Sequence, residues 1–383
     1  MTRQDATPPT SPTPPPPAPR RRDALTDVAG IRVGHARVAG AGALSGTTVV
    51  LAPEGGAVAA VDVRGGGPGT RETDALDPRN LVQRVDAVVL TGGSAFGLDA
   101  ASGVMAWLEE QGRGVRVGAD PSQVVPVVPA ACVFDLGRGG DWRARPDAST
   151  GRAAVEDAAR TEAGAAVAEG CVGAGTGAVA GQLKGGVGTA SILLPSGITV
   201  AALAVVNAAG SVLDPRTGVL YGEYGGAEPA VAPAPEIHQE AQQRLAQAHD
   251  ANTRPPLNTT LAVVATDADL GRAQAQKLAG TAHDGLARAV RPVHLMSDGD
   301  TVFALATGVR TLDPANPLAI NDLLAAGAEA VTRAIVKAVR AATGVNGRAG
   351  GGTYLAYGDL YDTPRQSAQS PDRTAREADS PST

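Results

Sequence analysis

The feature that most constrains this chain is the stretch from Pro255 to Asp267, where a proline-containing loop runs directly into an apolar strand. Residues 261–265 are short, apolar, partly β-branched and bounded by turn formers, so they predict a fully buried strand. The prolines before them cannot continue into that strand and must form a loop. A hydroxyl residue, Thr259, therefore lies at the entrance to a buried strand.

This junction has two interpretations. In the first, the chain cuts its own bond between Asn258 and Thr259, and the freed Thr259 becomes a nucleophile with its own amine beside it as a possible base. In the second, Thr259 and Thr260 are ordinary β-branched residues that open a strand. Taken alone, the stretch favours the second interpretation, so the choice depends on the rest of the chain.

Composition predicts a core of small side chains between two dissimilar ends. Residues 1–22 are proline-rich and residues 365–383 are polar, so both ends are expected to be disordered. Hydrophobic residues make up 43% of the 383 residues, but aromatic residues only 3%, and 49 residues are glycine. Alanine, valine and leucine must therefore fill the interior. Cys132 and Cys171 lack metal-type spacing and are interpreted as reduced core residues.

Charge and hydropathy argue against several classes of partner. The formal net charge is −6 and the basic residues are scattered among acidic ones, which argues against nucleic acid. The sequence has no apolar run of about 18 residues and no signal-peptide core, so we expect no membrane partner and a cytoplasmic location. The glycine-rich loop at 64–71 lacks the Lys-Ser/Thr ending of a phosphate-binding loop.

Apolar patterning predicts alternating strands and helices over residues 23–364. Residues 47–51 and 58–63 are predicted to pair as a hairpin, and residues 150–170 to form one helix interrupted by Gly164. The other helices are predicted at 99–111, 236–251, 269–288 and 321–343. Length alone leaves open whether these elements form one large domain or two.

Ser94 lies in the glycine-rich turn between a predicted buried strand at 85–91 and the helix at 99–111. Backbone N–H groups at such a turn can hold an anionic or carbonyl oxygen. The Gly-x-Ser-x-Gly pattern of a nucleophile elbow is absent, so we interpret Ser94 as a helix cap in preference to a nucleophile.

Two polar residues lie in apolar, glycine-rich surroundings. Lys184 stands alone among glycines, and we interpret it first as an exposed turn lysine; if it is buried, its pKa falls and it can polarise an oxygen. Asn207 ends a predicted buried strand, where its amide can satisfy turn backbone or donate to an oxyanion.

An acidic turn follows the junction. Asp298 and Asp300 flank a glycine between strands predicted at 293–296 and 301–306. Two carboxylates in such a turn commonly face water, but between apolar runs they can share a site.

Five blocks in this order resemble the P1 family of self-processing peptidases, which contains the L-aminopeptidase/D-esterases and β-peptidyl aminopeptidases. The blocks are Leu25 to His35, Thr91 to Leu98, Gly185 to Gly188, Asn258 to Thr260 with Val264 to Asp267, and Ser297 to Thr301. Within the family, the Asn-Thr junction is most similar to that of the nylon-oligomer (6-aminohexanoate-oligomer) hydrolases.

The resemblance implies a fold and a processing step. It implies an αββα four-layer sandwich of the α/β class over residues 23–364, similar to the N-terminal-nucleophile hydrolases but with altered connectivity. It also implies autocleavage between Asn258 and Thr259 into an α chain, 1–258, and a β chain, 259–383. A homo-oligomer of αβ units, expected to be a tetramer, is implied as well. The chemistry requires no metal or other cofactor.

The resemblance also implies catalytic roles. Thr259 would be the nucleophile, Asn207 the oxyanion donor, and Lys184 would help to hold the nucleophile or its charge. Asp298 and Asp300 would orient the amine and hydroxyl of Thr259 for proton transfer.

Two further points bear on the substrate. Aminopeptidase members are similar but have Ser followed by an acid at the two turn positions, so Asp298 with Asp300 favours the amide or oligoamide hydrolase branch. Ser94 and Phe134 are secondary candidates for the substrate pocket.

The predicted function is a self-processing amide hydrolase that forms an acyl-enzyme on Thr259 with a small amide or peptide substrate. The alternatives are an acyltransferase that uses the same nucleophile, an aminopeptidase acting on small peptides, and a non-catalytic binding protein on the same fold.

Overall fold

The computed structural model describes residues 21–226, 229–252, 257–347 and 350–361. Apart from residues 21 and 22, the ends predicted to be disordered, 1–22 and 365–383, lie outside these ranges.

Two five-stranded sheets form the centre of the molecule. Their strand orders are β1-β2-β5-β8-β4 and β11-β12-β13-β14-β3. The strands of the first sheet are β1 (Arg32–Arg37), β2 (Gly46–Leu51), β4 (Thr70–Arg71), β5 (Ala87–Thr91) and β8 (Ala130–Cys132). The strands of the second sheet are β3 (Val58–Val63), β11 (Val187–Leu193), β12 (Thr199–Val205), β13 (Leu261–Ala268) and β14 (Thr301–Arg310).

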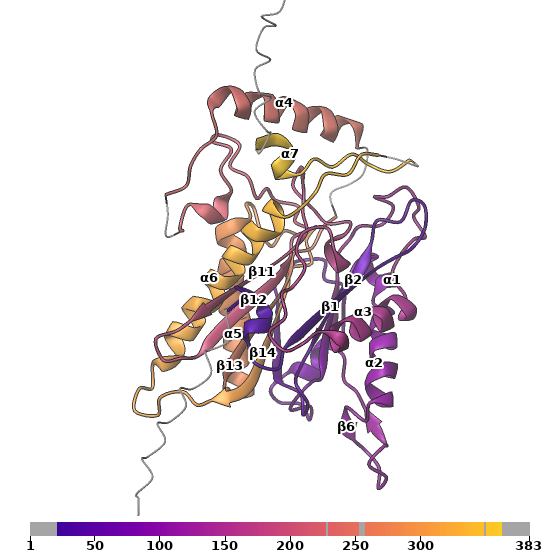
Figure 1. Cartoon of the computed structure of the whole chain (residues 1–383), viewed down its shortest axis with the longest axis vertical. Helices are drawn as coiled ribbons and strands as arrows, with labels where there is room; N and C mark the ends of the chain where they lie inside the picture. The colour runs from indigo at the N-terminus through magenta and orange to yellow at the C-terminus, as the bar shows by residue number, and fades with distance from the viewer. Residues whose placement is uncertain (1–20, 227–228, 253–256, 348–349, 362–383) are drawn as a thin grey trace, which may run out of the picture.

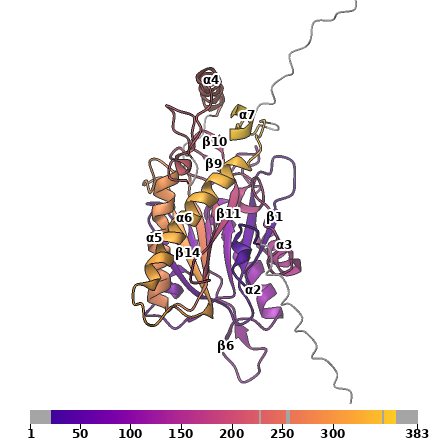
Figure 2. The ribbon, with the colours of Figure 1, turned by 60° about the vertical axis from the view of Figure 1, so that its left-hand side comes forward.

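Helices cover the outer face of each sheet and complete four layers (Figures 1 and 2). The helices α2 (Ala100–Glu110) and α3 (Ala148–Arg160) lie on the first sheet, and α5 (Arg272–Ala289) and α6 (Ala319–Arg340) lie on the second. The smaller elements are α1 (Ser94–Gly97), α4 (Pro235–Ala251), α7 (Tyr357–Tyr361), β6 (Val115–Arg116), β7 (Val124–Val125), β9 (Val179–Ala180) and β10 (Leu183–Lys184). This arrangement confirms the predicted αββα sandwich.

Period-two alternation in the central strands builds the layers. In β12, Val200 and Ala202 pack with α5 and α6 in one apolar cluster, whereas Ala201 and Leu203 belong to the cluster between the sheets. Successive side chains of a strand point to opposite faces, so a strand buried on both sides is apolar throughout. The predicted strand at 261–265 is confirmed within β13, whose residues are all buried.

Glycines let two helices contact the backbone of the sheets. A Cβ added to Gly188 in β11 would lie 2.2 Å from the carbonyl oxygen of Ala334 in α6. A Cβ added to Gly34 in β1 would lie 2.1 Å from the amide nitrogen of Ala158 in α3. Helix and sheet backbones therefore approach more closely than any larger side chain would allow, as the small-residue composition predicts.

The predicted hairpin of residues 47–51 and 58–63 is wrong. Both runs are strands, but β2 pairs with β5 in the first sheet, whereas β3 pairs with β14 at the edge of the second. The connecting loop thus carries the chain from one sheet to the other. Apolar periodicity identifies a strand, but it does not identify the neighbour with which the strand pairs.

One other predicted element is shorter than expected and another is absent from the described residues. The helix predicted over 150–170 ends at Arg160, where Thr161 is extended and its hydroxyl donates to the carbonyl of Ala158. The strand predicted at 293–296 does not form, because His294 has a φ of 59°, in the left-handed region that a strand cannot contain.

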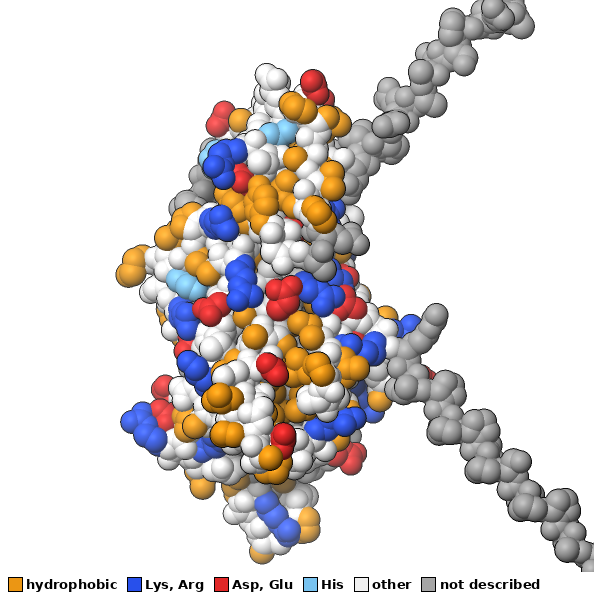
Figure 3. All heavy atoms as spheres, turned by 90° about the vertical axis from the view of Figure 1, so that its left-hand side faces the viewer, with side chains coloured by type: hydrophobic (Ala, Val, Ile, Leu, Met, Phe, Trp, Pro, Cys, Tyr) orange, Lys and Arg blue, Asp and Glu red, His pale blue; other side chains and the backbone are white. Residues whose placement is uncertain are grey.

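The outer surface carries both signs of charge. Figure 3 shows the side on which α6 lies, where basic and acidic side chains are interspersed. In the described part of the chain, no helix is long and apolar enough to cross a membrane.

Candidate active site

The second sheet brings several of the predicted site residues together where its central strands β12, β13 and β14 begin or end. Strands β13 and β14 are parallel, with Leu261 opposite Thr301, so the residues that precede both strands meet at the same edge. Strand β12 runs antiparallel to β13, with Val205 opposite Leu261, so its last residues reach that edge too. Asn207, the Asn258-Thr259 junction and the acidic turn, far apart in sequence, are thus neighbours.

The peptide group between Asn258 and Thr259 is buried and hydrogen-bonded through both its carbonyl and its N–H. Its carbonyl oxygen accepts from the N–H of Gly299 at 3.2 Å, and its own N–H donates to the carbonyl of Asn207 at 2.5 Å. The Thr259 hydroxyl lies 2.5 Å from the same Asn258 carbonyl oxygen. Thr259 is only 3% exposed. The hydroxyl thus lies directly beside the carbonyl of the peptide bond that precedes it.

Arg138 is a site residue that the sequence analysis missed. Its buried guanidinium donates to the side-chain oxygen of Asn258 at 2.6 Å, to that of Asn207, and to the carbonyl of Gly177 at 2.7 Å. The fork geometry of a guanidinium suits such bridging. Arg138 follows Gly137 and precedes Gly139, so the signal that identified Lys184, a single cation among glycines, could have identified it as well.

Asn207 is fully buried and its amide contacts protein groups on both sides. Besides Arg138, its side-chain oxygen accepts from the N–H of Val179 at 3.0 Å, and its amide nitrogen lies 3.4 Å from the carbonyl oxygen of Phe134. In this uncut chain, the backbone donor to the Asn258 carbonyl is Gly299, a group that the sequence analysis did not consider.

The two carboxylates of the acidic turn are buried and fix the backbone around the junction. Asp298 accepts from the N–H of Ala209 at 3.0 Å, and Asp300 from the N–H of Thr260 at 2.8 Å. Burial raises the pKa of Asp298, and the nearby Asp300 carboxylate acts in the same direction. Among the hydrogen bonds of the described residues, neither carboxylate bonds to Thr259.

Lys184 is fully buried, so its preferred interpretation as an exposed turn lysine is wrong. Its ammonium group donates to the carbonyls of Gly175, Ala178 and Gly185 at 3.1, 2.8 and 2.8 Å, which satisfies all three N–H groups. The glycine-rich turns around it supply these carbonyls. Burial lowers the pKa of Lys184 to about 8, so the group is still mostly charged at neutral pH.

The glycine-rich turn at 92–93 wraps a buried carboxylate, Asp135. The N–H of Gly93 donates to Asp135 at 2.7 Å, and burial raises the pKa of this carboxyl group. The interpretation of Ser94 as a helix cap is wrong. Gly93 is the N-cap of α1, and Ser94 is the first residue of that helix. The backbone N–H of Ser94 donates to the carbonyl of Val133.

The remaining residues singled out from the sequence are Phe134, Cys132 and Cys171. The Phe134 ring is half-buried and meets Trp142 edge-on at 6.3 Å between centroids. Cys132 is a buried free thiol as predicted, but Cys171 is only half-buried. Over the described ranges, no group of three or more His, Cys, Asp or Glu side chains could hold a metal ion.

Sequence comparisons show the family to which this chain is related. The pattern of peptidase family S58 matches residues 23–352. An uncharacterized aminopeptidase of Mycobacterium bovis is 51% identical over 346 residues, which cover 85% of this chain and 96% of the relative. A 6-aminohexanoate-oligomer endohydrolase of a Kocuria species is 31% identical over 274 residues, which cover 69% of each chain.

Solved structures share the architecture. A β-aminopeptidase of a Burkholderia species superimposes with a TM-score of 0.66 at 26% identity, over 90% of this chain and 94% of that one. An L-aminopeptidase D-Ala-esterase/amidase of Ochrobactrum anthropi, described as a new variant of the Ntn hydrolase fold, gives a TM-score of 0.65 over 90% and 93%. At 22% identity, this second likeness shows the fold alone. The resemblance expected from the five motif blocks is confirmed: the chain belongs to peptidase family S58 and is a hydrolase of carbon–nitrogen amide bonds.

Proposed function

We propose that this chain cuts itself between Asn258 and Thr259 and then uses the freed Thr259 as the nucleophile of an amide hydrolase. The observation that carries the proposal is the 2.5 Å distance between the Thr259 hydroxyl and the Asn258 carbonyl oxygen within a buried peptide group. The Gly299 N–H on the same oxygen supports it, because a donor there stabilises the charge that develops when the carbonyl is attacked.

Self-cleavage would proceed as an acyl shift from nitrogen to oxygen. The Thr259 oxygen bonds to the Asn258 carbonyl carbon and loses its proton, while the carbon–nitrogen bond breaks and the Thr259 nitrogen gains a proton. Water then hydrolyses the resulting ester, which leaves a carboxylate on Asn258 and a free amine beside the Thr259 hydroxyl. The chain supplies both reacting groups for the acyl shift, so water is the only other reactant that cleavage needs.

Hydrolysis of a substrate would use the same hydroxyl. Thr259 attacks the substrate amide, the leaving amine takes a proton, and an acyl-enzyme ester forms. Water releases the acid and restores the hydroxyl. The free amine of Thr259 is a possible base for this proton transfer.

The neighbouring groups have supporting roles in this proposal. Asn207 donates to the oxyanion formed with substrate. Lys184, held by three backbone carbonyls, stabilises the developing negative charge through its own positive charge. Asp298 and Asp300 hold the turn that orients Thr259 and its new amine. Ser94 and Phe134 line the substrate pocket. A homo-oligomer of αβ units remains a prediction.

The substrate class in this proposal is a small amide, either a short peptide or an oligoamide. The relatives include both kinds of enzyme: one is named an aminopeptidase, and another is named a 6-aminohexanoate-oligomer endohydrolase. The paired carboxylates of the acidic turn favour the oligoamide branch. Release of products from 6-aminohexanoate oligomers with blocked amino ends would support internal cleavage, whereas activity restricted to free amino ends would indicate an aminopeptidase.

Intact-mass measurement of freshly purified protein tests the proposal. The wild type should give two fragments, one of which begins at Thr259. Thr259→Ser keeps a hydroxyl and should also be cut, whereas Thr259→Val keeps the shape without the hydroxyl and should remain whole and inactive. An uncut, inactive wild type would refute the proposal. Transfer of the acyl group to an added amine in preference to water would instead indicate an acyltransferase.

A further inference from the structure

A histidine that the sequence analysis did not consider bonds to Asp300. The His294 Nδ1 lies 2.8 Å from one carboxylate oxygen of Asp300, and the His294 backbone N–H donates to that same oxygen at 3.0 Å. The other oxygen accepts from the N–H of Thr260 at 2.8 Å. Asp300 is therefore held by His294 on one side, and on the other side it holds the residue that follows Thr259.

The surroundings indicate which His294 nitrogen carries the proton. An ionised carboxylate only accepts hydrogen bonds, so Nδ1 must be the donor. The Nε2 atom is buried and has no hydrogen-bond partner among the described residues. A second proton on Nε2 would therefore lack an acceptor there. The geometry therefore makes the ring a donor from Nδ1 to Asp300.

A second histidine, which is buried, packs against His294. The rings of His283 and His294 meet edge to face, with centroids 4.9 Å apart. Helix α5 carries His283, whose Nε2 bonds to the backbone carbonyl of Asp62 in β3 at 3.0 Å, and burial lowers its pKa to about 4. His283 is thus neutral at pH 7 and adds no charge beside His294.

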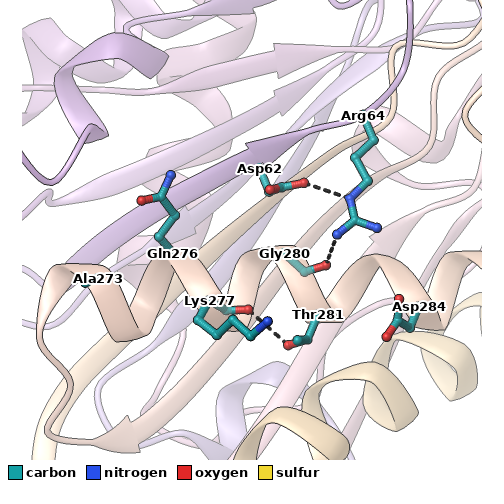
Figure 4. A pocket seen from close by; sticks show the side chains of 8 residues that line it. All are labelled: Asp62, Arg64, Ala273, Gln276, Lys277, Gly280, Thr281 and Asp284. Atoms are coloured by element: carbon teal, nitrogen blue, oxygen red, sulfur yellow. Dashed lines mark hydrogen bonds and ion pairs between the residues drawn. The ribbon is translucent and has the colours of Figure 1, made fainter.

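A surface hollow of about 520 Å³ lies between β3 and α5, and Asp62, the partner of His283, is one of the residues that line it (Figure 4). Arg64 bonds there to the Asp62 carboxylate at 3.0 Å and to the carbonyl of Gly280 at 2.6 Å. The bond from Arg64 to Gly280 joins the end of this strand to the helix near the bond between His283 and Asp62. The strand and the helix therefore fix the position of His283.

We propose that His294 is a positioning residue of the reaction, which holds the Asp300 carboxylate in the orientation that fixes the backbone next to Thr259. This inference rests on the proposed function. In this proposal, His294 acts through Asp300 and does not touch the substrate.

The backbone conformation of His294 suggests a matched pair of variants. Its φ of 59° is tolerated by Gly and by Asn better than by other residues. His294→Gly removes the donor without backbone strain, and His294→Asn keeps an N–H donor near the position of Nδ1. His249→Asn, at an exposed position of α4, is the control.

The kinetic readouts are the rate of self-cleavage and the steady-state constants on an oligoamide. His294→Gly should lower both the cleavage rate and kcat on the order of 10- to 100-fold, the usual effect of losing a group that orients a reacting residue, with little change in KM. His294→Asn should restore rates near those of the wild type and of the control. Rates unchanged in His294→Gly, or equally low in both variants, would overturn the proposal.

Nitrogen-15 NMR of histidine-labelled Thr259→Val protein tests the same proposal without activity. The uncut chain should show one imidazole protonated at Nδ1 whose signal disappears in His294→Asn. A signal from His294 protonated at Nε2 would overturn the assignment. An uncut wild type would refute the proposed function, but this tautomer measurement would still decide the placement of His294.

Discussion

The guanidinium of Arg138 donates a 2.6 Å hydrogen bond to the side-chain oxygen of Asn258, the residue on the acyl side of the proposed cleavage site. Both side chains are buried, at 8% and 6% exposure, and the Asn258 amide nitrogen donates to the carbonyl of Ala208 at 2.8 Å. The residue before the scissile bond is therefore fixed through its side chain as well as through its backbone.

Replacing Asn258 by leucine should destabilise the uncut chain by about 2 kcal/mol, because it leaves a buried guanidinium donor without that partner. Urea unfolding should be compared for Thr259→Val with and without Asn258→Leu, since the Thr259→Val background stays whole and gives one transition. Equal midpoints would show that the hydrogen bond adds nothing to the stability of the precursor.

Gly299→Ala should stop or strongly slow self-cleavage. A Cβ at this position would lie 2.7 Å from the Thr259 hydroxyl oxygen and 2.8 Å from the carbonyl oxygen of Gly67, so the nucleophile must move. A misplacement of about 1 Å can cost on the order of 100-fold in rate. Fragment formation followed on gels checks this, with Gly225→Ala as the control, since a Cβ there meets open space. Cleavage of both variants at the wild-type rate would contradict the proposed geometry.

Stability should fall as the pH drops from about 6.5 to 4. Burial lowers the pKa of His35 to about 4 from its ordinary 6.5, so the unfolded chain binds this proton first. The stabilisation is therefore present above pH 6.5 and lost as the pH falls through the folded value. The loss amounts to about 3 kcal/mol, and His283 contributes in the same direction.

Unfolding of Thr259→Val at several pH values measures this dependence. Adding His35→Asn should make the decrease between pH 6.5 and 4 less steep and leave the contribution of His283, while adding His249→Asn, which changes an exposed histidine, should leave the decrease unchanged. Parallel curves for the two variants would show that His35 is not responsible.

Gly188→Ala should destabilise the fold by about 3 kcal/mol, the upper end of the usual cost of overpacking. The added Cβ meets the backbone of α6, which cannot move aside as a flexible side chain can, and overpacking a tight contact typically costs about 1–3 kcal/mol. Thermal unfolding in the Thr259→Val background checks this against Gly225→Ala. A loss no larger than that of the control would mean that α6 can shift on the sheet.

The apolar pattern was sufficient to predict where some strands lie, but it did not predict how they pair. The run before Thr266 predicted β13 correctly, because a strand buried on both faces has few alternatives. The same kind of pattern gave the wrong partner for β3, since pairing depends on where the chain crosses between sheets. Lys184 was expected to be exposed because no neighbouring residue in sequence compensates its charge. Its three carbonyl partners include backbone brought close only by the glycine turns.

The sequence by itself determined the buried strand after the junction and the order of the motif blocks, because these depend on local periodicity and on residue type. The layered α/β class followed from the family that these blocks resemble. Only the tertiary structure decided that Asn207, Thr259 and Asp300 meet at one sheet edge, since this follows from β12 and β14 pairing with β13 on opposite sides. It also brought Arg138 into contact with Asn258 and His294 into contact with Asp300. Their partners lie far away in sequence or depend on an unusual backbone angle, and neither leaves a periodic signal.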